Sequence, residues 1–160
     1  MDISYVPFST KPELYGFIHE NTRRIGRETT DSTAVLANLS ALLFLELRDV
    51  NWAGFYLMKN GRLVLGPFQG KPAVAEIQVG SGVCGTAVEQ CRTQLVEDVH
   101  ACRNHIACDL STSSEIVVPI FVRDQLYGVM DIDSPLPARF DGEDRAGLEQ
   151  TARILGDILG

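Results

Sequence analysis

A cysteine in a polar setting is the first candidate for chemistry in this sequence. Cys108 lies in "HIACDLSTSSEIVV" (residues 105–118), next to Asp109 and ahead of a run of four small polar residues. Free cysteines in soluble proteins are usually buried as small apolar residues. Polar neighbours would keep this one hydrated, which is typical of a thiol that must meet a substrate.

A second thiol, Cys84, lies at the start of a short predicted helix, within "GSGVCG" (residues 80–85). The unpaired N–H groups and the positive end of a helix favour a thiolate, but a small buried residue at a crowded turn fits the position equally well. The segment also matches G-x-G-x-x-G. Residues 86–91 are too few for the helix of a dinucleotide-binding unit, so we favour a tight glycine turn.

Acidic residues gather near the C-terminal end of the chain, in "DID" at Asp131 and Asp133. In a strand, residues two apart share a face, so both carboxylates would point one way and Ile132 the other. Close carboxylates resist double ionisation, which keeps a proton available. Glu115, at the start of the neighbouring predicted strand, would add a third acid. A solvated turn at "DIDSP" is an equally good interpretation of the motif alone.

Two other motifs admit a structural and a functional interpretation. Cys102, His105 and Cys108 are zinc-ligand types at close spacing, but the paired C-x-x-C of structural zinc sites is absent, so we expect no metal. Trp52 and Tyr56 would by default pack in the core, although an indole can also wall a small-ligand cavity.

The overall composition restricts the class of protein. The chain has 160 residues and a net charge of −7, and it contains no run of Lys and Arg that would neutralise phosphates. This argues against a nucleic-acid partner. We find no signal peptide and no apolar stretch long enough for a membrane span, so we expect a cytoplasmic protein with reduced thiols.

The residue pattern predicts two helices, then strands, then a closing helix. Thr10 and Glu13 form a capping box for a helix through about Arg27, and Asp31 can cap a second one. A short helix follows Gly82, and the closing helix begins near residue 141. The predicted strands are 51–58, 62–68, 75–79, 94–99, 114–122 and 125–133. Hairpin connections dominate, so we expect an α+β fold: one domain over 1–160 with a mostly antiparallel sheet of about six strands and flanking helices.

Several long motifs resemble one known family. They are "NWAGFYL", "LVLGPFQGKPA", "GVCG", "EDVHACRNHIACD", "SEIVVPI" and "GVMDIDSP…RFD", and they span about residues 50 to 148. Together they resemble the free methionine-R-sulfoxide reductases, which are single GAF-type domains. The resemblance implies reduction of the R epimer of free methionine sulfoxide, and not of the residue within proteins.

The resemblance also implies roles for the thiols. It places the nucleophile at Cys108 and a partner thiol at Cys84, which implies a Cys84–Cys108 disulfide that thioredoxin reduces. Many members have a cysteine where "GKPAV" has Val74, so the recycling route stays open and Cys102 is an alternative partner. Cys91 lies two helical turns beyond Cys84, about 10 Å along the axis, and we expect it to pack in the core.

The remaining roles concern the substrate. The resemblance places substrate-binding carboxylates at Glu115, Asp131 and Asp133, and pocket walls at Trp52 and Tyr56. A carboxyl group with a raised pKa can protonate the sulfoxide oxygen while a thiolate attacks the sulfur, which yields methionine and a cysteine sulfenic acid. The other carboxylates can bind the substrate ammonium, a charge that peptide-bound methionine lacks.

The main alternative is a GAF module that senses a small ligand without catalysis. Such a module has no need for two thiols beside three pocket acids, and clustered carboxylates would repel a phosphate. We expect no cofactor. The sequence does not give the oligomeric state, and a homodimer is among the states it allows.

Overall fold

The computed structural model describes residues 8–101 and 110–160, so Cys102, His105 and Cys108 lie outside the described residues. Within these ranges the chain forms four α-helices and one six-stranded sheet. The elements are α1 (Lys11–Glu28), α2 (Ser32–Glu46), β1 (Trp52–Lys59), β2 (Arg62–Gly70), β3 (Glu76–Gln78), α3 (Gly82–Gln90), β4 (Gln94–Val96), the 3-10 turn η1 (Val99–Ala101), β5 (Ser114–Val122), β6 (Gln125–Ser134) and α4 (Gly142–Leu159). None of these helices is long and apolar enough to cross a membrane.

The sheet has the order β3-β2-β1-β6-β5-β4, and every neighbouring pair is antiparallel. The chain leaves the sheet at one edge after β3, passes through α3, and returns at the other edge as β4. β6 lies between β5 and β1 and joins the two halves of the sheet. The predicted α+β fold with a mostly antiparallel sheet of six strands is therefore confirmed.

The helix starts follow the sequence signals. The Thr10 side chain accepts a hydrogen bond from the Glu13 backbone N–H at 3.3 Å, and Asp31 does the same for Ala34 at 2.9 Å. Each bond satisfies a donor that the first turn of a helix leaves unpaired.

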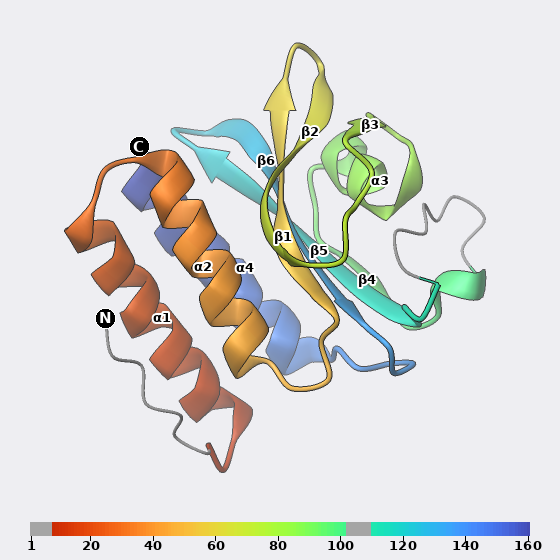
Figure 1. The fold of residues 1–160 in the computed structure, drawn as a ribbon, viewed down its shortest axis with the longest axis horizontal. Coiled ribbons are helices and arrows are strands. Elements are labelled where there is room, and N and C mark those ends of the chain that lie inside the picture. The colour runs from red at the N-terminus through yellow and green to blue at the C-terminus, as the bar shows by residue number, and fades with distance from the viewer. Residues whose placement is uncertain (1–7, 102–109) are drawn as a thin grey trace.

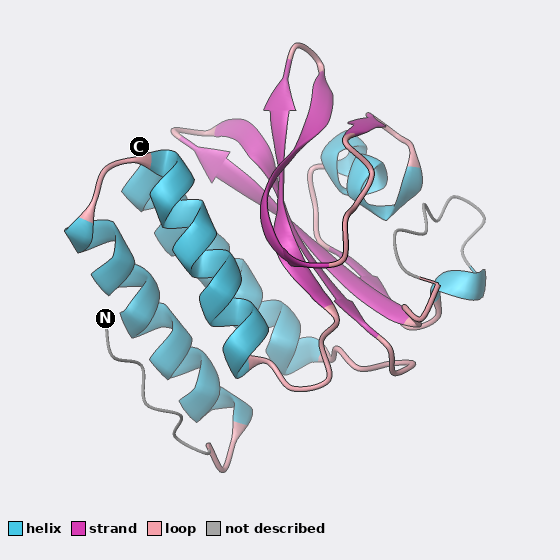
Figure 2. Cartoon of the chain, viewed as in Figure 1, coloured by secondary structure: helices cyan, strands magenta, loops and turns pink. Residues whose placement is uncertain are grey.

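The two faces of the sheet are covered differently (Figures 1 and 2). Helices α1, α2 and α4 lie together on one face, whereas α3 stands alone over the other. Residues such as Ala53, Phe55 and Ile132 point into the three-helix side and join its apolar core. Trp52 and Tyr56 join a second, smaller core under α3. Alternation along the strands therefore divides the molecule into a large apolar layer and a smaller layer beneath α3.

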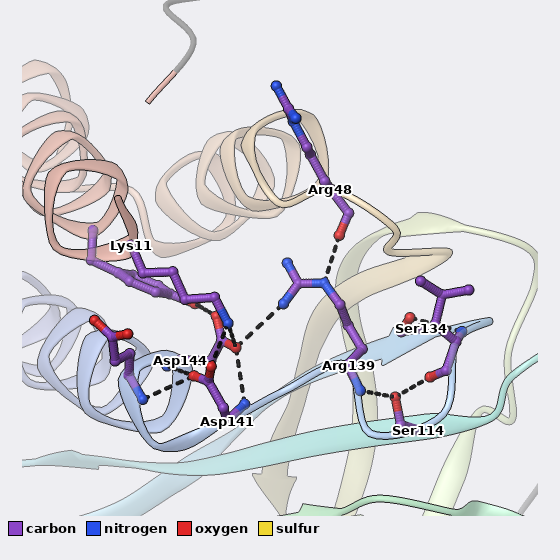
Figure 3. Close-up of polar contacts among 10 residues, drawn as sticks. Lys11, Arg48, Ser114, Ser134, Arg139, Asp141 and Asp144 are labelled. Atoms are coloured by element: carbon purple, nitrogen blue, oxygen red, sulfur yellow. Dashed lines mark hydrogen bonds and ion pairs between the residues drawn. The ribbon is translucent and has the colours of Figure 1, made fainter. Parts of the chain in front are cut away.

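A buried carboxylate ties the three-helix layer together (Figure 3). Asp144 is fully buried and accepts hydrogen bonds from the Tyr15 hydroxyl at 2.7 Å, from Lys11 Nζ at 2.7 Å and from an Arg139 guanidinium nitrogen at 3.3 Å. Arg139 also donates to the Arg48 carbonyl at 2.9 Å, just after α2. Burial and the adjacent Asp144 carboxylate raise the pKa of Tyr15. One acid thus connects α1, α4 and the segment after α2.

We predict that Asp144→Ala destabilises the protein by about 3 kcal/mol, because it leaves the buried Tyr15 hydroxyl without its acceptor and takes from the half-buried Lys11 and Arg139 their common partner. Thermal unfolding followed by circular dichroism should show a melting temperature lower by roughly 10 °C. Glu143→Ala is the matched control, since Glu143 lies in the same first turn of α4 but is exposed. Equal stability of the two variants would contradict this role of Asp144.

Candidate functional site

Three acidic side chains meet on the face of the sheet that α3 covers. Glu115 on β5 pairs directly with Asp133 on β6, and Asp131 lies two residues along the same strand, opposite Val117. All three are buried, with 5%, 8% and 6% of their surface exposed for Glu115, Asp133 and Asp131. The structure brings the predicted carboxylates together: β6 runs to Ser134, so both aspartates lie within the buried strand, and the exposed turn begins only at Pro135.

Cys84 joins these acids from above. It is buried in the first turn of α3, and its sulfur lies within 4.8 Å of a carboxylate oxygen of Glu115 and of Asp131. A glycine makes this approach possible, because a Cβ at Gly85 would lie 2.4 Å from the Gln78 carbonyl oxygen. The helix start is held by backbone bonds from Ser81 to Gln78 at 3.0 Å and from Gly80 to Gly85 at 2.9 Å. The glycine-rich segment therefore makes a tight turn that seats α3 against the sheet.

The electrostatics of Cys84 differ from the expectation for a helix start. Burial raises the pKa of the Cys84 thiol well above its usual value, and Asp131, Glu115 and Asp133 raise it further. A hydrogen bond to Asp131 favours the protonated form as well. The prediction that the helix start favours a thiolate at Cys84 is wrong, because three nearby carboxylates and the loss of water outweigh half a charge of helix dipole.

An aromatic stack forms the side wall beside the acids. Trp52 stacks on Phe68 with 5.1 Å between ring centroids and on Tyr56 with 6.0 Å. On the sheet, Trp52 pairs with Asp133, which places the indole in the same row as that acid and Glu115. The structure therefore places Trp52 and Tyr56 beside the predicted carboxylates.

Backbone carbonyls of the segment after β2 fix both rings. The Trp52 indole N–H donates to the Lys71 carbonyl at 3.1 Å, and the Tyr56 hydroxyl donates to the Val74 carbonyl at 2.8 Å. Val74 packs against the small core that contains Cys84. Position 74 thus lies at the edge of the site, but in this chain it offers a methyl surface in place of a thiol.

Sequence reasoning missed two residues of this region. Phe68 completes the aromatic stack, and Gly54 makes room for it, since a Cβ at Gly54 would lie 2.3 Å from the Phe68 Cβ. Asn51 donates from its side chain to the hydroxyls of Ser111 at 3.3 Å and Thr112 at 3.2 Å. Asn51 therefore anchors the chain at Ser111 and Thr112, which follow the range 102–109 in the sequence by two and three residues; Cys108 belongs to that range, which lies outside the described residues.

The cluster is also the one place where the described residues bring three metal-ligating side chains together: Cys84, Glu115 and Asp131. A thiolate with two carboxylates is a donor set that suits a divalent cation. Cys102, His105 and Cys108, the zinc-ligand types for which the sequence predicts no metal, lie outside the described residues. The two carboxylates also suit the ammonium group of an organic ligand, because an ammonium group, like a divalent cation, carries positive charge.

Comparisons with known proteins agree with this geometry. Residues 29–159 match the family model described as GAF domain. The chain is 49% identical over 149 residues to the free methionine-R-sulfoxide reductase of Escherichia coli, covering 93% of this chain and 90% of that protein. The fold is similar to the structure of free methionine-R-sulfoxide reductase from Neisseria meningitidis in complex with its substrate, with a TM-score of 0.94, 38% identity, and coverage of 99% of this chain and 96% of that one. It is also similar to a putative GAF sensor protein from Burkholderia vietnamiensis, with a TM-score of 0.89, 50% identity, and coverage of 92% and 94%.

We predict that Cys84 reacts slowly with iodoacetamide at neutral pH and that its rate rises only well above the pH at which an ordinary thiol ionises. Asp131→Asn should shift this rise to lower pH, because it removes a negative charge beside the thiol and replaces a charged hydrogen-bond acceptor with a neutral amide. Alkylation rates across a pH series, assigned to Cys84 by fragmentation of its peptide, measure the effect. Asp157→Asn, an exposed acid of α4, is the control, and an identical shift in both variants would contradict the local cause.

Proposed function

Because this chain belongs to the GAF domain family and, within it, to the free methionine-R-sulfoxide reductases, which are oxidoreductases, we propose that it reduces free L-methionine-(R)-sulfoxide to methionine by thiol chemistry. The observation that carries the proposal is the buried cluster of Glu115, Asp131 and Asp133 around the Cys84 thiol, next to the aromatic stack.

The acid cluster accounts for recognition of a free amino acid. Buried carboxylates at 5–8% exposure are poorly hydrated, so a ligand ammonium that replaces the lost water interacts with them strongly. The nitrogen of a methionine residue inside a protein is an uncharged amide and lacks this attraction to the carboxylates. The flat face of Trp52 can contact the apolar methyl group at the other end of the substrate.

The first chemical step is assigned to Cys108, which lies outside the described residues. Its thiolate attacks the sulfoxide sulfur while the oxygen receives a proton from a carboxyl group of the cluster. The sulfur–oxygen bond breaks, methionine leaves, and Cys108 becomes a sulfenic acid. The bonds from Asn51 to Ser111 and Thr112 support this assignment, because they fix residues three and four positions after Cys108 in the sequence next to the start of β1, where Trp52 pairs with Asp133.

Recycling follows through Cys84. Its sulfur attacks the sulfenic acid, a Cys84–Cys108 disulfide forms, and water leaves with the oxygen. Because the Cys84 thiol donates a hydrogen bond to Asp131, that carboxylate can take the proton as the sulfur–sulfur bond forms. Val74 offers no competing thiol at the neighbouring position. Thioredoxin is the proposed reductant of the disulfide, and the reducing cytoplasm the proposed compartment.

A ligand-sensing role without catalysis is the second candidate, supported by the similarity to the putative GAF sensor from Burkholderia vietnamiensis. A sensor built on this site would still bind a cationic or zwitterionic ligand, because the buried acids oppose an anion. The two candidates differ in turnover and not in ligand charge.

We predict turnover with the R epimer of free methionine sulfoxide and none with the S epimer, measured as NADPH consumption coupled through thioredoxin and its reductase. Cys108→Ser should abolish turnover and leave the fold intact, because serine is close in size but does not ionise near neutral pH. Cys91→Ser, at an exposed thiol, is the matched control and should retain activity. Tight binding of the substrate without turnover in the parent protein would support the sensor instead.

We predict that Glu115→Gln, Asp131→Asn and Asp133→Asn each impair reduction of the free amino acid. A residue that binds the ammonium should raise KM by about tenfold to a hundredfold, as expected for loss of a charged hydrogen bond, and a residue that supplies the proton should lower kcat. Asp124→Asn, in the exposed turn between β5 and β6, removes the same charge away from the site and is the control. Steady-state kinetics with free and N-acetylated methionine sulfoxide measure the effect, and the N-acetylated substrate should lose this dependence. Unchanged kinetics in all three variants would remove the acid cluster from the mechanism.

A further inference from the structure

A cavity of about 310 Å³ lies where the connection from α3 to β4 meets β5 and α4. Its polar lining consists of Cys91, Arg92, Thr93, Arg145, Glu149 and Arg153, and Val118, Pro119, Phe121 and Ala152 complete the wall. None of the acids of the proposed active site lines it. Its volume is within the range of small-molecule sites, roughly 300–1,000 Å³.

The cavity is positively charged in a protein whose net charge is −7. Arg92, Arg145 and Arg153 face a single acid, Glu149. The Glu149 carboxylate accepts hydrogen bonds from the Thr93 hydroxyl at 2.7 Å and from Arg145 Nε at 3.0 Å, which lowers its pKa against the effect of its burial and keeps it ionised. Three guanidinium groups against one carboxylate leave an excess of positive charge at the cavity.

The three arginines are exposed side chains that line the cavity, and each uses one nitrogen in a hydrogen bond to a neighbouring side chain. Arg92 donates through Nε to the Gln90 side chain at 3.1 Å, and Arg153 donates through one terminal nitrogen to Gln150 at 2.8 Å. Arg145 uses Nε for Glu149. Within the described residues, these bonds engage one nitrogen of each guanidinium, and the planar group can present the others to a carboxylate.

Cys91 adds a nucleophile to this cavity, contrary to the expectation that it packs in the core. Its thiol is exposed, because the chain turns into the left-handed conformation at the end of α3, with a φ of 51° and a ψ of 40°. The sulfur lies 3.4 Å from the Val88 carbonyl oxygen, which holds it beside the last turn of the helix. An accessible thiol therefore shares one small cavity with three arginines.

We propose that this cavity binds a small disulfide that carries carboxylates and that Cys91 is the site of its thiol–disulfide exchange. The arginines hold the carboxylates, and the Cys91 thiolate attacks the nearer sulfur of the bound disulfide. A bond forms between Cys91 and that sulfur, the original sulfur–sulfur bond breaks, and the departing thiolate carries the electron pair away and takes up a proton. The product is a mixed disulfide at Cys91, and a second thiol can reverse it.

Two disulfides of opposite charge test the proposal: oxidised glutathione, which is anionic, and cystamine, which is cationic. The full-length reduced protein is incubated with each at low ionic strength, and adducts are counted by mass spectrometry. Cys84 and Cys91 have no Lys or Arg between them and share one tryptic peptide, so fragmentation must assign the site. We expect the anionic disulfide to modify Cys91, and the ratio of its rate to that of cystamine to fall about tenfold in Arg145→Gln/Arg153→Gln.

The control removes the same charge elsewhere. Arg23→Gln/Arg27→Gln acts on exposed arginines of α1 and should leave the ratio unchanged. Cys91→Ser should lose this adduct, while the parent protein at high salt should behave like the double variant at the cavity, because ions screen the exposed guanidinium groups. The proposal is overturned if oxidised glutathione leaves Cys91 unmodified, or if the rate ratio is the same in both pairs of arginine variants. Because the readout is an adduct and not turnover, it is independent of the proposed reductase activity.

Discussion

Burial of three carboxylates on one face of the sheet is the constraint from which the rest of this structure follows. An ionised carboxylate removed from water costs several kcal/mol unless its surroundings replace the lost hydration. The layer under α3 therefore contributes less stability than an apolar layer of the same size. The opposite face holds the larger apolar core, in which residues of α1, α2 and α4 cluster with strand residues such as Ala53, Phe55 and Ile132. The unequal covering of the two faces reflects this division between a stabilising layer and a reactive one.

The same charges that suit the cluster for a substrate ammonium also keep Cys84 protonated. Asp131, Glu115 and Asp133 raise the pKa of its thiol together with burial, so a single electrostatic cause has two chemical effects. In the proposed mechanism, a protonated thiol at this position does not compete with Cys108 for the sulfoxide, because the thiolate is the nucleophile. The Cys84 thiol can form a disulfide only where a nearby group accepts its proton, and Asp131 accepts a hydrogen bond from it. The proposed order of the two sulfur reactions is thereby linked to the arrangement of the acids.

The parts of this site that the sequence predicted are those that depend on local rules. Alternation along a strand placed Asp131 and Asp133 on one face and Ile132 on the other, and the capping residues Thr10 and Asp31 marked two helix starts. The parts that it missed depend on contacts between distant segments. Phe68 meets Trp52 only through the pairing of β1 with β2, and Asn51 reaches residues 60 positions away in the chain.

The pKa of Cys84 was predicted in the wrong direction for a similar reason. The helix dipole is visible in the sequence, whereas the carboxylates that overcome it come from two other strands. Only the resemblance to a known family placed Cys84, Glu115 and Asp131 in one site from the sequence.

Helix α3 shows most clearly why local rules fail for thiols. It carries Cys84 in its first turn and Cys91 just after its last residue, and a helix of this length separates them by only about 10 Å. One thiol faces carboxylates in a buried site, and the other faces arginines at an exposed cavity. Under the two proposals, charge complementarity directs an ammonium-bearing substrate to the first thiol and an anionic reagent to the second. Position along one short helix thus does not determine the reactivity of either cysteine, since the segments packed around each sulfur set its charge environment.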